Sequence, residues 1–545
     1  MGKKNTIGAE PVYDARKLGK GRMTLLGVQH MFAMFGATVL VPMLTGLSIS
    51  TTLLFAGLGT LLFHVITGFK VPAFLGSSFA FLGGYAAIAP LDGKDGMTNA
   101  QLLPYACLGV ACAGVVYLIL AGLIRAIGVQ KVMKFFPPVV TGPIIICVGL
   151  QLAGSAVSNC SANWTVAIIA LAVVIIFNIW GKGMAKIIPI VLGVIIAYAA
   201  AVGFDVAALL CPSLSESAPA IFTGSNVNFT PVLDVCRNIA EGKIWGNLIG
   251  LPIVKEATVL GVDWSNTSLV LSAVIAITPI ALATMMEHIG DISAIGSTVG
   301  KNYIKDPGLH RTLTGDGLAT TIASLFGAPA NTTYGENTGV LVLTRVYDPK
   351  VVRIAAYFAV GISFFPIVAA VIETIPTAVI GGISFVLYGM IAAIGVRNVV
   401  ENQVDFTKSR NLIIAAVILV STLGINSLGG ISFTIGTVTI SLTGLAVASI
   451  AGILLNAILP GKDYVFSTEE PKDTGVNFAV GANSERLSKE AAAKETVETV
   501  EETAEEKAVS AEEAEAEAAC AAAAMAAAVE QEPVEETASD ETVSE

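Results

Sequence analysis

Three acidic side chains in the second half of the chain have the spacing for proton-coupled binding of a polar ligand. Glu287 and Asp291 are four residues apart and therefore share one face of a helix, and Glu336 follows in a segment interrupted by Pro and Gly. Carboxylates inside an apolar span are costly and by default indicate function. Because like charges in a low dielectric disfavour full ionisation, at least one of the three could take up a proton near neutral pH. We therefore predict that Glu287, Asp291 and Glu336 provide proton coupling.

Asp291 has a competing interpretation. Lys301 and Lys305 follow it, so it could instead lie at a cytoplasmic helix end in a solvated ion pair. Asp316 and Glu373 are weaker candidates, because Asp316 could lie in the first turn of a helix and Glu373 in an external loop.

Two interrupted segments provide backbone groups for binding. Residues 71–81, ValProAlaPheLeuGlySerSerPheAlaPhe, and 328–339, AlaProAlaAsnThrThrTyrGlyGluAsnThrGly, contain Pro and Gly where a membrane helix should be continuous. Non-helical backbone at membrane depth must be buried in protein or line a cavity, so we expect the two segments to face each other. Their freed N–H groups, beside half-helix N-termini, could bind the carbonyl oxygens of a planar polar ligand. The predicted ligand-binding residues are Ser78, Phe79, Tyr334, Gly335, Glu287 and Glu336.

Gln29 and His30 lie within the first apolar stretch. A buried polar pair that holds a neighbouring helix is a better interpretation than direct ligand contact, so we predict a supporting role for both, and for Asn337. Packing is the alternative role for the glycines and aromatic residues of the interrupted segments, because small residues allow close helix contacts and aromatic rings fill apolar cores.

The elements that must position these residues are membrane-spanning helices. The chain is 54% apolar and only 13% charged, which argues against a soluble enzyme of ordinary composition. Apolar stretches long enough to cross a hydrocarbon core of ~30 Å recur along it. We predict an all-α polytopic membrane protein with about fourteen transmembrane spans: 24–47, 51–69, 72–90, 101–124, 135–157, 164–180, 187–211, 267–290, 312–327, 330–344, 351–372, 375–396, 411–424 and 435–459.

The two halves of the chain have matching arrangements. Gln29 and Ser78 are 49 residues apart in the first half, and Glu287 and Glu336 are 49 residues apart in the second. Seven spans per half is an odd number, so the second copy must enter the membrane inverted. We expect two inverted seven-span repeats, with spans 3 and 10 broken where they meet at the midplane.

The predicted domains are a cytoplasmic segment 1–22, a first repeat 23–211, an external loop 212–266, a second repeat 267–460 and a tail 461–545. This division places 21 Lys and Arg residues on one side of the membrane and 4 on the other, so both termini are expected in the cytoplasm. Because the first twenty-two residues are polar, we expect no cleavable signal before the first span, and we expect the plasma membrane. The tail, Ala- and Glu-rich with 23 acidic and 6 basic residues, cannot bury a core and is expected to be largely disordered.

Metal and nucleotide-hydrolysis chemistry have little support in the sequence. The seven cysteines and four histidines show no CxxC or CxxH spacing, and no GxxxxGK[ST] run occurs. We therefore predict no metal site and no cofactor, with the proton as coupling ion, and no nucleic-acid partner.

Three motifs resemble those of the nucleobase-ascorbate transporter family. They are GluAsnThrGlyValLeuValLeuThrArg at 336–345, GlnHis at 29–30 and MetGluHisIleGly at 286–290. The likeness covers about 22–460 and implies a core domain of spans 1–4 and 8–11, a gate domain of spans 5–7 and 12–14, and a nucleobase as ligand. It also implies that Glu287 and Glu336 hold the edge of the base, while backbone at Phe79 and Gly335 completes the site.

The resemblance leaves the identity of the base open. The run ProAlaAsnThrThrTyrGlyGluAsn is close to the form typical of uracil permeases, and Glu336 stands where purine-specific members usually carry Gln. Asp291, however, stands where the uracil permease pattern has His, and acidic residues there also occur in purine transporters. The leading prediction is a proton-coupled symporter that imports uracil, and the alternative is a xanthine or urate permease. The expected partners are the base, the proton and the lipid bilayer, and a homodimer is a candidate assembly.

Two other classes have weaker support. An anion exchanger or channel would favour a basic residue at the breaks, and none occurs in 72–89 or 328–344. A membrane-embedded enzyme would need a nucleophile–base pair or a metal cluster in the spans, and the sequence indicates neither.

Overall fold

The computed structural model describes residues 11–218, 220–435, 438–461 and 464. The chain divides into two compact units, Met1–Val480 and Gly481–Glu545. The second unit lies wholly outside the described residues, and so does almost all of the tail 461–545 for which disorder is predicted. All the helices and strands named below belong to the first unit.

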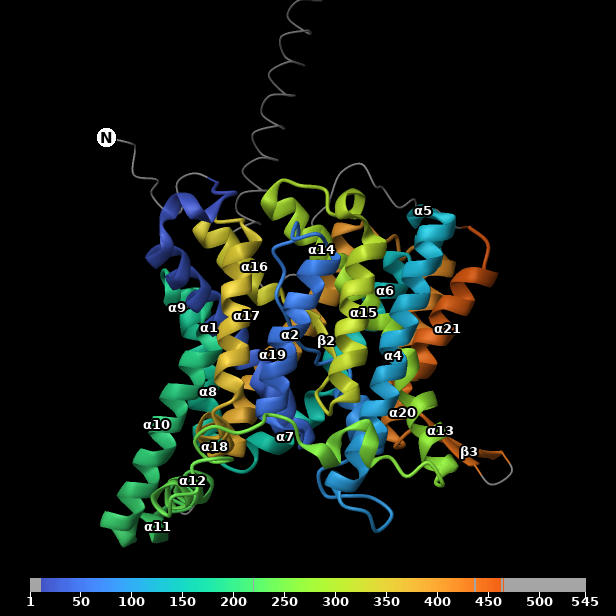
Figure 1. Ribbon diagram of the computed structural model, residues 1–545. Helices are drawn as coiled ribbons and strands as arrows, with labels where there is room; N and C mark the ends of the chain where they lie inside the picture. The colour runs from blue at the N-terminus through green and yellow to red at the C-terminus, as the bar shows by residue number, and fades with distance from the viewer. Residues whose placement is uncertain (1–10, 219, 436–437, 462–463, 465–545) are drawn as a thin grey trace, which may run out of the picture. The chain divides into compact units, whose positions relative to one another are not determined.

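Helices make up most of the first half of the chain (Figure 1). A 3-10 turn, η1 (Ala15–Leu18), precedes them, and the strand β1 (Leu75–Ser77) interrupts the third apolar segment. The helices are α1 (Lys20–Thr45), α2 (Ile49–Ile66), α3 (Leu82–Ile88), α4 (Asn99–Ile127), α5 (Val129–Met133), α6 (Pro138–Gln151), α7 (Ala153–Cys160), α8 (Trp164–Ile179), α9 (Met184–Ile187) and α10 (Pro189–Leu210).

The remaining chain starts with α11 (Pro212–Ser217) and α12 (Thr230–Ala240), so the predicted external loop 212–266 is partly helical. Short turns η2 (Lys255–Ala257), η3 (Val259–Gly261), η4 (Thr278–Ile280) and η5 (Ile304–Gly308) and strand β2 (Asn331–Thr333) lie between the later helices. These helices are α13 (Thr267–Ile277), α14 (Ala281–Val299), α15 (Leu309–Leu325), α16 (Gly335–Thr344), α17 (Pro349–Ser363), α18 (Pro366–Glu373), α19 (Thr377–Glu401), α20 (Ser409–Ser427) and α21 (Gly444–Ile458).

Eight helices of the described residues are long and apolar enough to cross a membrane, or nine if the bent pair α17 and α18 is one span. Two further apolar helices, α8 and α21, are shorter. Spans 3 and 10 are each divided between a strand and a half-helix, as the Pro and Gly residues predicted. The total of fourteen spans stays a prediction.

The predicted span 435–459 is wrong in its first part. Strand β3 (Ile431–Ile435) pairs antiparallel with β4 (Val438–Leu442), and α21 begins only at Gly444. Apolar and hydroxyl residues alternate in IleSerPheThrIle and in ValThrIleSerLeu. That alternation has the period of a strand, so this stretch forms a hairpin although its mean hydropathy is that of a span.

The predicted span 351–372 is not one straight helix. Its two parts, α17 and α18, meet at an angle of 86°. Pro366 starts α18 and has no N–H to continue the preceding helix, and its ring restricts the residue before it, Phe365, to the extended backbone observed there.

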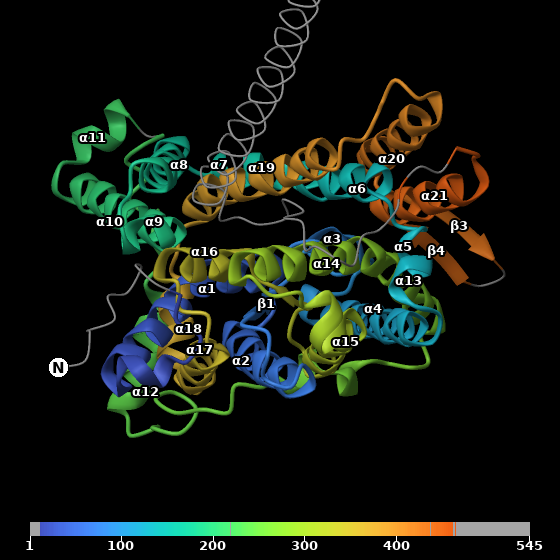
Figure 2. The ribbon, with the colours of Figure 1, turned by 90° about the horizontal axis from the view of Figure 1, so that it is seen from above.

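Contacts divide the helices into two groups, which Figure 2 shows as two rows. In one row, α19 contacts α6, α8 and α10, while α20 contacts α6 and α21. In the other, α15 contacts α2 and α4, while α17 contacts α1 and α2. The interrupted segments belong to the second row, where β1 contacts α1 and α2, and β2 contacts α14 and α15. The two rows have the membership of the expected gate and core domains.

Under the predicted numbering of the spans, several contacts in one half have a counterpart in the other at spans seven places along the chain. The contact of α4 with α15 corresponds to that of α17 with α2, and the contact of α10 with α8 corresponds to that of α21 with α20. The contacts of α2 with α15 and of α6 with α19 correspond to themselves. Figure 1 also places η1 and α5 at one end of this unit, and α11, α12 and the β3–β4 hairpin at the opposite end.

Candidate substrate-binding site

The two interrupted segments meet as a two-stranded antiparallel pair, which confirms the prediction that they face each other. The register of β1 and β2 pairs Leu75 with Thr333, Gly76 with Thr332 and Ser77 with Asn331. Two backbone hydrogen bonds of 2.9 Å extend the pair, from the Ser78 N–H to the Ala330 carbonyl and from the Tyr334 N–H to the Phe74 carbonyl. Each strand therefore satisfies backbone groups of the other where no helix can do so.

A threonine on a neighbouring helix anchors each strand in the same way. Thr60 of α2 accepts from the Leu75 N–H at 2.9 Å and donates to the Leu75 carbonyl at 3.2 Å. Thr320 of α15 accepts from the Asn331 N–H at 3.2 Å and donates to the Asn331 carbonyl at 2.9 Å. The outer edge of each strand thus has its polar groups paired with a hydroxyl.

Tyr334 is buried at the junction of the strands. Its hydroxyl donates to the Ser77 carbonyl at 2.9 Å and lies 3.3 Å from the Thr38 hydroxyl of α1. Its ring covers Gly76, where a β-carbon would overlap the ring atoms. The side chain therefore supports the strand pair, and stacking of its ring on a ligand stays a prediction.

Half-helices begin close to both strands. After β1 the chain turns at Phe79 and enters α3, whereas α16 starts at Gly335, two residues beyond β2. N–H groups in the first turn of a helix have no partner within that helix, so the amides of Gly335 and Glu336 are suited to an anionic or carbonyl oxygen. The Glu336 side chain is not among those that the structure describes. The Ser78 hydroxyl is buried and has no hydrogen-bond partner among the described residues.

Phe79 connects the interrupted segment to the other row of helices. Its ring lies edge-to-face with that of Tyr388 on α19, with centroids 6.4 Å apart and an interplanar angle of 71°. Both rings are buried. The sequence did not single out Tyr388, because one tyrosine in an apolar span has no local signal that separates a site residue from packing.

Glu287 and Asp291 lie one turn apart on α14, the helix that contacts β2 and α16. Asp291 is only 3% exposed, so its interpretation as a solvated ion pair at a helix end is wrong. Glu287 is half-buried. Two of the three predicted coupling carboxylates thus lie on the helix that contacts the strand junction, and this helix continues eight residues beyond Asp291.

A buried His–Asp pair next to these carboxylates was missed as a site element. His288 Nδ1 lies 2.8 Å from the Thr333 hydroxyl of β2 and 3.1 Å from Asp316 Oδ2 of α15, and both His288 and Asp316 are fully buried. The expectation that Asp316 occupies a first turn is wrong, because α15 begins at Leu309 and Asp316 lies in its third turn. Asp316 could have been recognised from the sequence as a site candidate, because it is an acidic residue inside an apolar span.

His30 and Asn337 are in contact across α1 and α16. The Asn337 amide donates to the His30 carbonyl at 3.0 Å and lies 3.2 Å from His30 Nδ1. The Gln29 side-chain oxygen is buried and has no partner among the described residues. This places all three predicted supporting residues at the α1 side of the strand junction, while their supporting role stays a prediction.

Within the part of the chain that the structure describes, no group of three His, Cys, Asp or Glu side chains is placed to hold a metal ion. The six described cysteines are free. The chemistry of the junction therefore rests on carboxylates, two histidines, hydroxyls and backbone amides.

Comparison with known families decides the class of protein. The profile of a family described as the Permease family matches residues 21–431, which is more than half of the chain. The chain belongs to the nucleobase-ascorbate transporter family. It is therefore a multi-pass membrane permease and not an enzyme. The strand junction described above lies entirely within the range that this family profile matches.

Individual relatives in the family are similar along most of their length. The chain is 39% identical over 465 residues to the uracil permease of Bacillus caldolyticus, covering 83% of this chain and 96% of that one. It is 38% identical over 460 residues to the uracil permease of Bacillus subtilis (strain 168), covering 82% and 93%. Among solved structures, the transmembrane domain of a cyanobacterium bicarbonate transporter BicA matches with 13% identity and a TM-score of 0.45, covering 82% and 99%.

Proposed function

We propose that this permease is a proton-coupled symporter that imports uracil across the plasma membrane. The observation that carries the proposal is the strand junction, after which α16 begins in contact with α14, the helix that carries Glu287 and Asp291. Relatives named as uracil permeases, at up to 39% identity, support the choice of base. Uracil presents an alternating set of N–H donors and carbonyl acceptors along its edges, which suits a site made of carboxylates and backbone amides.

In this proposal Glu287 and Glu336 hold the N–H edge of the base, and backbone at Phe79 and Gly335 donates to its carbonyl oxygens. The rings of Phe79 and Tyr388 close the site on the side of α19. A protonated carboxyl can donate and accept, whereas an ionised one only accepts. Protonation and binding of the base then favour each other, and by linkage the effect is reciprocal.

The proposed topology consists of fourteen spans in two inverted repeats, 23–211 and 267–460, with both termini in the cytoplasm. The interchangeable contacts of the two halves and the matched anchors Thr60 and Thr320 support the repeats. The excess of Lys and Arg at the end that carries η1 and α5 supports the orientation. A homodimer stays a prediction, to be checked by cross-linking of single-cysteine variants in native membranes.

A xanthine or urate permease is the second candidate, because the acidic residue Asp291 is buried beside the site.

An uptake panel separates uracil transport from purine transport. Purified protein in liposomes is given labelled uracil, xanthine or urate with an inward proton gradient, with the gradient collapsed, and with competing unlabelled bases. Uracil accumulation that requires the gradient is expected. Purine accumulation without uracil uptake would support the second candidate, and accumulation unaffected by collapse of the gradient would exclude proton coupling.

A further inference from the structure

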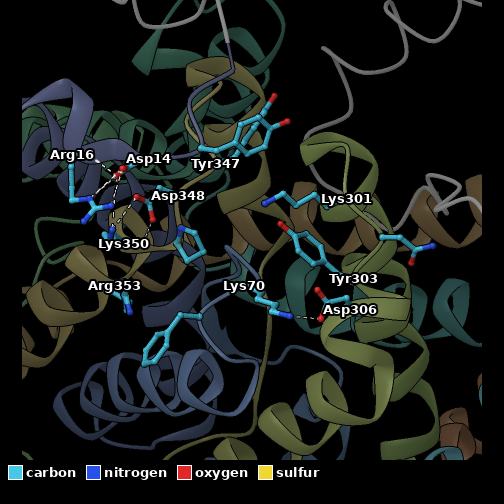
Figure 3. A pocket seen from close by; sticks show the side chains of 14 residues that line it. Asp14, Arg16, Lys70, Lys301, Tyr303, Asp306, Tyr347, Asp348, Lys350 and Arg353 are labelled. Carbon is cyan, nitrogen blue, oxygen red and sulfur yellow. Dashed lines mark hydrogen bonds and ion pairs between the residues drawn. The ribbon is translucent and has the colours of Figure 1, made fainter.

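A pocket lies at the end of the first unit that carries η1 (Figure 3), and none of the described residues that line it belongs to β1 or β2. Its volume is about 620 Å³, within the range of small-molecule sites. The walls are formed by the N-terminal segment, by three connecting segments (from α2 to β1, from α14 to α15, and from α16 to α17), and by the start of α17. None of the predicted site residues whose side chains the structure describes lines it.

The wall contributed by the N-terminal segment is fixed in place. Val12 forms backbone hydrogen bonds of 2.8 Å with Arg345 and Tyr347, and Tyr13 donates its hydroxyl to the Val299 carbonyl at 2.9 Å. The Ala15 N–H donates to the Asp348 carboxylate at 2.9 Å. The pocket is therefore assembled from chain segments that hydrogen bonds already hold together, which lowers the entropic cost of binding a ligand.

The pocket carries surplus positive charge. Among the described residues, five basic and three acidic side chains line it, which gives these residues a net charge of +2. The acidic members have basic partners inside the pocket: Asp14 pairs with Arg16, Asp306 with Lys70 and Asp348 with Lys350. A hydrogen bond from the Arg16 side chain holds the pKa of the Asp14 carboxyl low, at about 2, so this pair stays charged at neutral pH.

Two cations account for the surplus. Lys301 Nζ lies 5.0 Å from the centroid of the Tyr13 ring, and Arg353 Cζ lies 4.6 Å from that of Phe69. Neither forms an ion pair with a carboxylate of the described residues. A ring face attracts a cation but leaves its N–H donors free for a stronger acceptor. Each of Lys301 and Arg353 could therefore bind an anionic group of a ligand.

Aromatic rings stand beside these cations. Tyr13 and Tyr347 have ring centroids 5.6 Å apart, tilted by 56°, and Tyr303 and Phe69 complete the set. About half of the surface of Tyr13 and of Phe69 is exposed, so their rings offer free faces to a planar group. Phosphate recognition by Arg and Lys together with ring stacking is the chemistry that binds a nucleotide.

We propose that this pocket binds a small phosphomonoester that carries a planar ring, of the nucleoside monophosphate class. Lys301 and Arg353 lie on opposite sides of the pocket (Figure 3), so a single ligand would span it: Arg353 receives the phosphate, and the planar ring lies against Tyr13 beside Lys301. The proposal rests on the proposed orientation, which opens the pocket to the cytosol, and not on which base is transported. An anionic lipid headgroup has the same phosphate chemistry without the ring, so the test must separate the two sources.

The test uses the full chain purified in detergent, with thermal unfolding and calorimetric titration as readouts. Uridine and adenosine 5′-monophosphate, inorganic phosphate and uridine are added in turn, and phosphatidylglycerol micelles form a separate arm. We expect either monophosphate to raise the unfolding temperature, inorganic phosphate to bind at least tenfold more weakly, and uridine to have no effect. Because Lys301 is exposed and Arg353 is only half-buried, raising the salt concentration should weaken the binding.

The decisive variants are Lys301→Gln and Arg353→Gln, each expected to weaken monophosphate binding at least tenfold. Lys17→Gln is the matched control, since Lys17 is exposed on the same N-terminal segment but does not line the pocket. Uracil binding, measured in parallel, should be unchanged in all three, which shows that the variants fold and separates this proposal from the proposed transport function.

Three results would overturn the proposal. Monophosphates could fail to bind, or they could bind equally well to the wild type, the two pocket variants and the control. Phosphatidylglycerol alone could stabilise the protein through Lys301 and Arg353, in which case the ligand is a lipid headgroup and the ring plays no part.

Discussion

The two interrupted spans have the same construction but different chemistry. Each has a three-residue strand, a half-helix and an anchoring threonine on the helix before the break. Around the second, however, the structure gathers Glu287, Asp291 and the pair His288–Asp316, whereas no charged residue occurs between 71 and 89. The first break therefore contributes backbone shape to the junction, and the second break contributes charge as well.

The largest effect is expected from breaking the junction that the two spans share. Gly76→Val adds a branched side chain where even a β-carbon would overlap the ring of Tyr334. Overpacking of this kind typically costs about 1–3 kcal/mol or more, so we expect a lower unfolding temperature and loss of uracil binding. Gly389→Ala on α19, with open space at its β-carbon, is the control and should change neither quantity. Normal stability and binding in Gly76→Val would refute the packed junction.

Glu287→Gln tests whether charge in the second half couples the proton. A permanently neutral side chain cannot exchange a proton, so uptake driven by a pH gradient should be abolished, while exchange of uracil across the membrane survives. Uptake and counterflow in proteoliposomes measure the two activities. Glu373→Gln, at the end of α18, should behave as wild type. Preserved pH-driven accumulation in Glu287→Gln would move the coupling role to Asp291 or Glu336.

Glu336→Gln tests the other predicted ligand carboxylate. One acceptor oxygen becomes a donor against a fixed edge of the base, and an unpaired hydrogen-bonding group left behind costs about 1–3 kcal/mol. We therefore expect weaker uracil uptake, by roughly tenfold to a hundredfold, and a shift of selectivity towards purines at normal membrane abundance. Competition of labelled uracil with xanthine measures the shift, and unchanged affinity and selectivity would remove Glu336 from the site.

A smaller effect, equal in the two halves, is expected at the threonine anchors. Thr60→Val and Thr320→Val each remove two hydrogen bonds to a strand without changing side-chain volume much, at a cost of about 1–3 kcal/mol. Thermal unfolding of both variants checks the magnitude. If one variant lowered the unfolding temperature strongly and the other did not, the two interrupted spans would not be equivalent in construction.

The smallest change in uptake is expected from deletion of the tail, which lies outside the two interrupted spans. Deleting everything after Glu485 should leave uptake and membrane abundance unchanged, because an Ala- and Glu-rich segment contributes no core. Reduced uptake at normal abundance would give the tail a regulatory role.

The interruptions of spans 3 and 10 and the buried carboxylates could be predicted because their residue types differ from the apolar sequence around them. Pro and Gly in a span, and an acidic residue in an apolar run, are local signals. The strand pairing was not predictable in detail, since Ser77 and Tyr334 are 257 positions apart and no local pattern encodes their contact. The pairing of His288 with Asp316 depends in the same way on how α14 packs against α15.

The predicted spans 435–459 and 351–372 were wrong in part, although the sequence contained evidence against each. Averaging hydropathy over a window hid that evidence. In the β3–β4 hairpin the alternation of apolar and hydroxyl residues marks strands, but averaging over a window removes the alternation. At the bend between α17 and α18, Pro366 indicated a break, yet the flanking residues are apolar enough for a continuous span.

The pairing of β1 with β2 has a consequence for biosynthesis. β1 is synthesised more than 250 residues before its partner, so at about 5–20 residues per second its inner edge waits on the order of 10–50 s for β2. During that interval its peptide groups cannot remain in lipid without partners. The first half must therefore stay close to the insertion machinery or to water until the second half arrives, and a nascent chain truncated before β2 should be a preferred target of membrane proteases.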